Sequence, residues 1–91
     1  MSTPSAKRYG FVGIIVADRK SQGARINQVL ATHGDLIQGR LGMPNLHGGE
    51  LSIITLIVHG TTEELSALTG KLGSLPGVSV KSALHKLEGA P

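Results

Sequence analysis

The chain has 91 residues and fits a single folded domain, because a division would leave neither part with enough apolar residues for a core. With 40% hydrophobic residues, 16% charged residues and a formal net charge of only +3, the composition excludes a disordered chain. The absence of cysteine excludes disulfides, iron–sulfur ligation and thiol catalysis, and is compatible with the cytoplasmic location that we expect.

The composition also argues against direct contact with nucleic acid. Tyr9 and Phe11 are the only aromatic residues, too few for a platform on which bases stack. The basic residues of the N-terminal half are spread out and do not form the dense patch that binds phosphates. The longest apolar run, residues 53–58, is far shorter than the ~20 residues of a membrane span, so no contact with a membrane is expected.

Residues 9–17 (YGFVGIIVA) predict the first strand, because they form a β-branched apolar run that is too short for a typical helix. A helix should follow, with Ser21 as its N-cap and Gly34 just after its end. Its apolar positions recur at spacings of three and four residues and are Ile26, Val29, Leu30 and His33.

Residues 36–43 alternate in polarity and predict a half-exposed second strand. The alternation places Ile37, Leu41 and Met43 on one face, and Gln38 and Arg40 on the other. Turn residues 44–49 (PNLHGG) then lead into a third, apolar strand at 51–59 (LSIITLIVH). The second and third strands should pair antiparallel.

The last part of the chain predicts a helix and a strand. Thr61 and Glu64 have the spacing of a capping box, in which each side chain satisfies a backbone N–H group at the start of a helix. Leu65, Leu68 and Leu72 form the apolar stripe of this helix, and residues 75–77 (LPG) end it. Alternation over residues 78–84 predicts the last strand.

The order strand, helix, strand, strand, helix, strand is that of the α+β ferredoxin-like fold, a four-stranded antiparallel sheet with two helices on one face. Right-handed connections place the first and third strands in the centre of the sheet. We expect a disordered leader at residues 1–7, one domain at 8–87 and a tail at 88–91.

Both faces of the two central strands are apolar, and this indicates an oligomer. Phe11 and Ile15 oppose Val12, Ile14 and Val16 on one strand, and Ile53 and Ile57 oppose Ile54, Leu56 and Val58 on the other. Helices on one side would leave the other aliphatic face in water, which monomers rarely tolerate over a large area. The open face or the edge strands should therefore contact further copies of the chain in a homodimer or homotetramer.

The chain resembles the iron-only (FeFe) hydrogenase system regulators, small domains that are similar to ACT domains and to the C-terminal domain of the nickel-responsive regulator. The resemblance rests on residues 39–44 (GRLGMP), 60–62 (GTT), 68–73 (LTGKLG) and 76–83 (PGVSVKSA), in this order. It implies an ACT-like fold and a role in regulating hydrogenase genes or hydrogenase maturation.

The histidines raise the alternative of a metal-responsive domain, because imidazole is a common ligand of transition metals. No two histidines lie within five residues of each other, so neither an H-x-H nor an H-x₃-H pair exists. His59 and His85 are the weak candidates, across a subunit interface, and we predict no metal site within one chain.

The segment Asp18, Arg19, Ser21, Gln22 and Gly23 is the candidate ligand-binding loop. It resembles the ACT loop that binds amino acids at a subunit interface. Free N–H groups at a helix start attract a carboxylate, and Asp18 could accept a hydrogen bond from an ammonium group. The alternative is an ordinary solvated turn; Lys20 to Gln22 stand where ACT domains commonly carry a proline before the glycine.

A second candidate contact is Gly39 with Arg40, where a cation lies beside a residue that allows close approach of a backbone. The pair could contact an anion or a facing subunit, and a bulge at the sheet edge explains the glycine equally well.

No Ser/His/Asp arrangement, carboxylate pair or G-x-S-x-G motif is present, so we predict neither a catalytic site nor a cofactor. The sequence favours an oligomeric regulatory domain, either a transcriptional regulator or a sensor of a small molecule such as an amino acid. A metal-responsive domain is the alternative, and a small ferredoxin-like enzyme has the least support.

Overall fold

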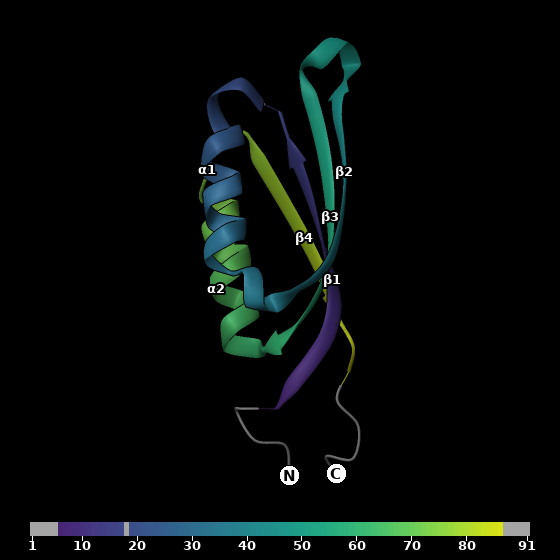
Figure 1. Cartoon of the computed structure of the whole chain (residues 1–91), viewed down its shortest axis with the longest axis vertical. Helices are drawn as coiled ribbons and strands as arrows, with labels where there is room; N and C mark the ends of the chain where they lie inside the picture. Colours follow the sequence, from purple (N-terminus) through teal and green to yellow (C-terminus); the bar gives the residue numbers. More distant parts are fainter. Residues whose placement is uncertain (1–5, 18, 87–91) are drawn as a thin grey trace.

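The two apolar central segments form the middle strands of a four-stranded antiparallel sheet (Figure 1). A computed structural model describes residues 6–17 and 19–86. The elements are β1 (Lys7–Val16), α1 (Arg19–Thr32), β2 (Ile37–Leu46), β3 (Leu51–Thr61), α2 (Thr62–Gly73) and β4 (Val78–Leu84). The strand order β2-β3-β1-β4 confirms the predicted ferredoxin-like βαββαβ arrangement, with the first and third strands in the centre.

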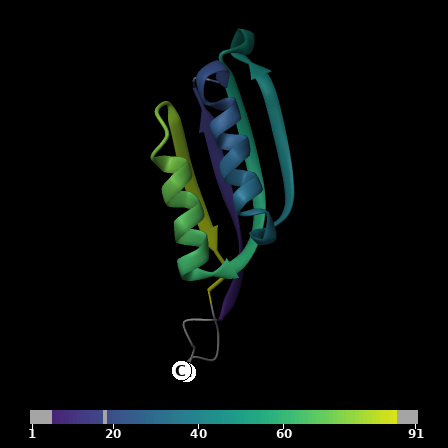
Figure 2. The same cartoon turned by 60° about the vertical axis from the view of Figure 1, so that its left-hand side comes forward.

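Both helices lie on the same face of the sheet (Figures 1 and 2). They do not approach it equally. α2 lies close to β4, β3 and β1, whereas α1 approaches α2 and stands farther from the strands. The wider separation on the α1 side leaves space between this helix and the β2–β3 hairpin.

The hydrophobic core lies between the helices and the sheet, and it follows from the alternation of the central strands. Each buried Val, Leu or Ile contributes about 1.5–3 kcal/mol to folding relative to an exposed position. The fully buried strand residues are Val12, Ile14, Val16, Leu56 and Val58. They meet the helix residues Ile26, Leu30, Leu65, Leu68 and Leu72.

The predicted capping box at the start of α2 is present. The Glu64 N–H donates to Thr61 Oγ1 at 3.1 Å, and the Thr61 N–H donates to Glu64 Oε1 at 2.8 Å. Two backbone donors that the helix itself cannot satisfy are thus satisfied by side chains.

The start of α1 differs from the prediction, because the helix begins at Arg19 and Ser21 lies inside its first turn. Gln22 lies four residues before Ile26 and eight before Leu30, on the buried stripe of the helix. Gln22 is 5% exposed, although glutamine is usually an exposed residue. The prediction started the helix too late because it was based on the cap preference of Ser21, and a serine can also lie inside a first helical turn.

The second strand contains an irregularity that corrects its predicted faces. Ile37 pairs with Val58 and Gly39 with Ile57, so one extra residue lies in β2 at Gln38. Ile37 therefore faces the helices, while Leu41 and Met43 face the opposite side. The prediction had placed these three side chains on one face, because strict alternation assumes that no residue is inserted.

The sheet begins earlier than the predicted domain boundary. β1 starts at Lys7, which pairs with Thr61 although it was assigned to the leader. Residues 1–5 of the predicted leader and the whole predicted tail, 88–91, lie outside the described residues.

Candidate ligand-binding pocket

A pocket of about 290 Å³ lies between α1 and the β2–β3 hairpin, on the helix side of the sheet. It occupies the space that α1 leaves by standing away from the strands. Its apolar wall consists of Val16, Ile26, Pro44 and Ile54, and it is bordered by Met43, whose side chain faces the other side of the sheet. A mostly apolar cavity with a few polar groups is the common form of a small-molecule site.

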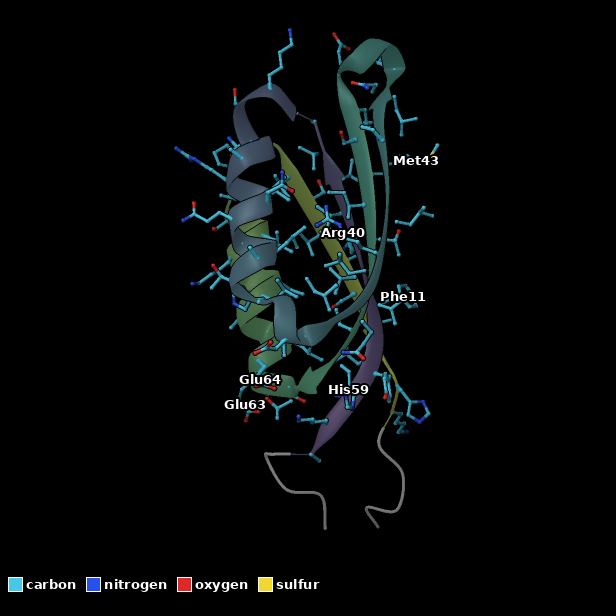
Figure 3. The ribbon with its side chains drawn as sticks, viewed as in Figure 1. Phe11, Arg40, Met43, His59, Glu63 and Glu64 are labelled. Atoms are coloured by element: carbon cyan, nitrogen blue, oxygen red, sulfur yellow. The ribbon has the colours of Figure 1, made fainter. Side chains whose placement is uncertain are left out.

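Arg40 provides the positive charge of this pocket. The residue pairs with buried Leu56, which directs its side chain to the helix side, and Figure 3 shows it extending from β2 toward α1. The guanidinium forms no hydrogen bond or ion pair with any residue of the described part of the chain. A free guanidinium presents a planar set of donors that matches a carboxylate or a phosphate.

Ser52 is a buried polar member of the pocket wall. Its side chain is 6% exposed, and its Oγ has no hydrogen-bond partner among the described residues. Gln22 Oε1, on the neighbouring turn of α1, is likewise buried and without a partner there. Such atoms are rare, because leaving a buried polar group unsatisfied costs about 1–3 kcal/mol.

The pocket joins residues that the sequence assigned to two separate candidate sites. Gly23, from the candidate loop, and Arg40, from the second strand, both line it. Ser21, Gln22 and Gly23 belong to the first turns of α1, not to a loop, and Arg19 is the first residue of this helix.

Two of the predicted residues are not among those that line this pocket in the described part of the chain. Gly39 is in β2 beside the bulge and does not belong to the pocket wall. Asp18 lies outside the described residues.

Sequence reasoning missed Asn27 and Ser52. Asn27 follows Gly23 by four residues and shares its side of α1, so helical spacing could have found it. Ser52 is a polar residue at a helix-facing position of an otherwise apolar strand, which is a signal that the sequence does contain.

The candidate metal ligands His59 and His85 flank one aromatic residue. His59 pairs with Tyr9 across the sheet, and the two rings stack with centroids 4.0 Å apart. The His85 N–H donates to the Tyr9 carbonyl at 2.7 Å. Within the described residues, no three His, Cys, Asp or Glu side chains come together as a metal site would require.

The sheet face opposite the helices is covered by large exposed apolar side chains, and we call it the open face. Figure 3 shows Phe11 and Met43 pointing away from the helices. The exposed large hydrophobic residues of this face are Tyr9, Phe11, Ile15, Leu41, Met43, Ile53 and Ile57. Leu41 is 68% exposed and central Ile57 is 48% exposed, so the described residues of one chain leave this face uncovered.

No helix of the described residues has the length and apolar character needed to cross a membrane.

The fold and its neighbours define an ACT-like domain. The chain superimposes on the ACT domain of GTP pyrophosphokinase from Chlorobium tepidum with a TM-score of 0.66 and 20% identity, covering 91% of this chain and 92% of that one. The regulatory subunit of aspartate kinase from Thermus flavus gives a TM-score of 0.58 at 15% identity, covering 88% and 55% of the two chains. At these identities the likeness concerns the fold alone.

The chain belongs to the TM1266-like family, described as "Iron-only hydrogenase system regulator, putative", whose sequence model matches residues 8–82. The structure of TM1266 from Thermotoga maritima is 32% identical, with a TM-score of 0.83, and covers 89% of this chain and 100% of that one. No curated protein matches significantly. The family is thus the one that the sequence motifs indicated.

Proposed function

We propose that this protein is a non-enzymatic regulatory domain that senses a small molecule in the pocket between α1 and the β2–β3 hairpin. It acts in the cytoplasm as a homo-oligomer, on a hydrogenase-type system as the family description implies. Any effect on transcription passes through a partner, because the elements of the described residues contain no helix-turn-helix motif.

The observation that carries the proposal is the polar composition of the pocket. The buried Ser52 hydroxyl, which has no partner among the described residues, lines the same cavity as the solvent-exposed guanidinium of Arg40. The hydroxyl would be more stable with a partner, and the guanidinium is available to an anion. A bound effector would supply those partners. The stabilisation gained on binding is then available to shift the protein between two states, as regulation requires.

The open face supports the oligomeric part of the proposal, with a second copy of this chain as the partner. Its central strands carry no acidic residue on this side and present aliphatic and aromatic side chains. A twofold axis places the same apolar patch on both sides of an interface, which requires no charge complementarity. Contact between two open faces would remove this surface from water.

A thermal-shift screen of the full chain against amino acids, organic acids, nucleotides and divalent metals tests the sensing role. We expect at least one small organic compound to raise the melting temperature, because a ligand that binds only the folded state stabilises it. Arg40→Gln should remove this shift. The control is Gln28→Glu, a substitution of similar size on the exposed face of α1, and it should retain the shift. If no compound stabilises the protein, or only a metal does, the proposed role is wrong.

An Asp18→Ala variant in the same screen tests the original loop prediction. A shift that persists in Asp18→Ala but is lost in Arg40→Gln would assign the effector to the pocket alone.

A further inference from the structure

We infer that the pocket between α1 and the β2–β3 hairpin takes a short aliphatic carboxylate whose second polar group is uncharged, as in a branched 2-oxo or 2-hydroxy acid. This inference rests on the proposed sensing function and adds the chemical class of the effector.

The volume of the pocket indicates the size of the ligand. Liquid water occupies about 30 Å³ per molecule, so a volume of about 290 Å³ holds on the order of ten non-hydrogen atoms. Small-molecule sites commonly begin near 300 Å³ and extend to about 1,000 Å³. The pocket thus matches a compound of the size of a branched-chain acid, and a nucleotide would extend beyond it into solvent.

The charges of the pocket wall set the charge of the ligand. Arg40 is the one charged residue among the described lining residues, so a ligand with a single negative group is matched and a cationic group finds no counterion there. A phosphate dianion would bring two negative charges to a pocket whose described lining has the single positive charge of Arg40. These two considerations favour a monocarboxylate over both a phosphate and a zwitterion.

The remaining lining residues specify the rest of the molecule. Val16, Ile26 and Ile54 offer a hydrocarbon surface for an aliphatic body. Ser52 Oγ can donate or accept, and the Asn27 amide can do both, so a neutral carbonyl or hydroxyl group is matched by either.

Gly23 keeps the pocket open. A Cβ added at this position would meet no other heavy atom within 4 Å, and the free space beside it includes the pocket that Gly23 lines. Glycine is unfavourable inside a helix compared with leucine. A larger side chain here should therefore favour the helix and at the same time occupy the space of the ligand.

Calorimetric titration of the full chain with four compounds of one carbon skeleton tests the inference. The compounds are 3-methyl-2-oxobutanoate, 2-hydroxy-3-methylbutanoate, valine and the amide of the hydroxy acid, with inorganic phosphate as a fifth probe. We expect the oxo or hydroxy acid to bind at least tenfold more tightly than valine, the amide or phosphate.

Variants place the binding in this pocket. Arg40→Gln should weaken binding of the preferred acid at least tenfold, and Gly23→Leu should abolish it without lowering the melting temperature. Gly70→Leu is the matched control, because Gly70 lies in α2, away from the pocket, and a Cβ there also meets no atom within 4 Å. It should leave the affinity unchanged.

The outcomes separate the inference from the proposed function. If valine binds more tightly than both acids, the inference that the second polar group is uncharged is wrong. The ammonium group of valine would then have a counterion that is not among the described lining residues. If none of the four compounds binds while another organic compound from the thermal screen does, the ligand class is wrong and the sensing function stands. Unchanged affinity in Gly23→Leu would mean that the ligand lies elsewhere.

Discussion

Glu64 is both a cap of α2 and a titrating group. Its carboxylate accepts a hydrogen bond from the Thr61 N–H, and this bond holds the pKa of Glu64 below its ordinary value of 4.5 (Figure 3 labels the residue). A pKa that is lower in the folded than in the unfolded state means that the charged form stabilises the fold. The contribution is complete above the unfolded-state pKa and is lost as the pH falls through the folded-state pKa.

The pH dependence of Glu64→Gln checks this contribution. At neutral pH the variant should have a lower urea midpoint than the original protein, because the amide keeps an acceptor but loses the charge. The difference should shrink and vanish as the pH falls below 4.5. Glu63→Gln removes a charge from the same turn without touching the capping box, so it controls for general electrostatics. A difference between the two midpoints that stays constant from pH 7 to pH 3 would contradict the assignment.

Single residues also show what the sequence could reveal about the site. Gly23 and Arg40 were recognisable as candidates, because a glycine at a helix start and a cation among glycines are unusual locally. Their meeting in one cavity depends on how far α1 stands from the sheet, which local pattern does not encode. Ser52 was not predicted as a pocket residue, because the third strand was interpreted from its apolar residues alone.

The pairing of β1 with β4 depends on a close approach at Gly10. A Cβ there would collide with the Ala83 carbonyl oxygen and lie 2.6 Å from Leu84 Cδ2. The backbone of β4 cannot yield without weakening its hydrogen bonds to β1, and overpacking of this kind costs about 1–3 kcal/mol. Glycine at this position is therefore required by the sheet.

Gly10→Ala should lower the free energy of unfolding by about 1–3 kcal/mol, measured by urea denaturation. Gly39→Ala is the matched control in another strand, because a Cβ at Gly39 meets no heavy atom within 4 Å. Equal stability of the two variants would show that β4 accommodates the extra methyl group.

At the level of elements, the sequence predicted types and order well because each element carries its own periodic pattern. The capping box marked the start of α2 to the residue, because Thr61 and Glu64 satisfy each other's backbone N–H groups at a fixed spacing of three residues. The bulge at Gln38 left no such mark. One inserted residue reverses every later face of a strand, so Ile37 was separated from Leu41 and Met43 by an event that alternation cannot represent.

The whole molecule has two candidate functional surfaces, the pocket and the open face, that share one strand. On the helix side, β2 contributes Arg40 and Gly42 to the pocket, and on the other side it contributes Leu41 to the open face. Met43 belongs to both, because it lines the pocket and is 54% exposed on the open face. As an edge strand with register shifts at both ends, β2 is paired on one side only, to β3.

This shared strand predicts that effector binding and oligomer formation are coupled. A ligand that fixes Arg40 and Met43 changes how β2 presents its other face, so it should change the association constant of the open faces. Thermodynamic linkage requires that association change the ligand affinity by the same factor, which for coupled sites is commonly about 5- to 150-fold. Sedimentation equilibrium, with and without the preferred ligand of the pocket, measures the factor by which the ligand changes the association constant.

A monomeric variant measures the factor by which association changes the ligand affinity. Ile57→Glu places a charge in the centre of the open face and should yield a monomer at micromolar concentration, while Gln28→Glu, on the exposed side of α1, should remain oligomeric. The ligand affinity of the monomer should then differ from that of the oligomer by the factor found in sedimentation. A monomeric original protein would remove the open face as an interface. Equal ligand affinities in oligomer and monomer would instead leave the interface intact and show that β2 does not transmit binding across the sheet.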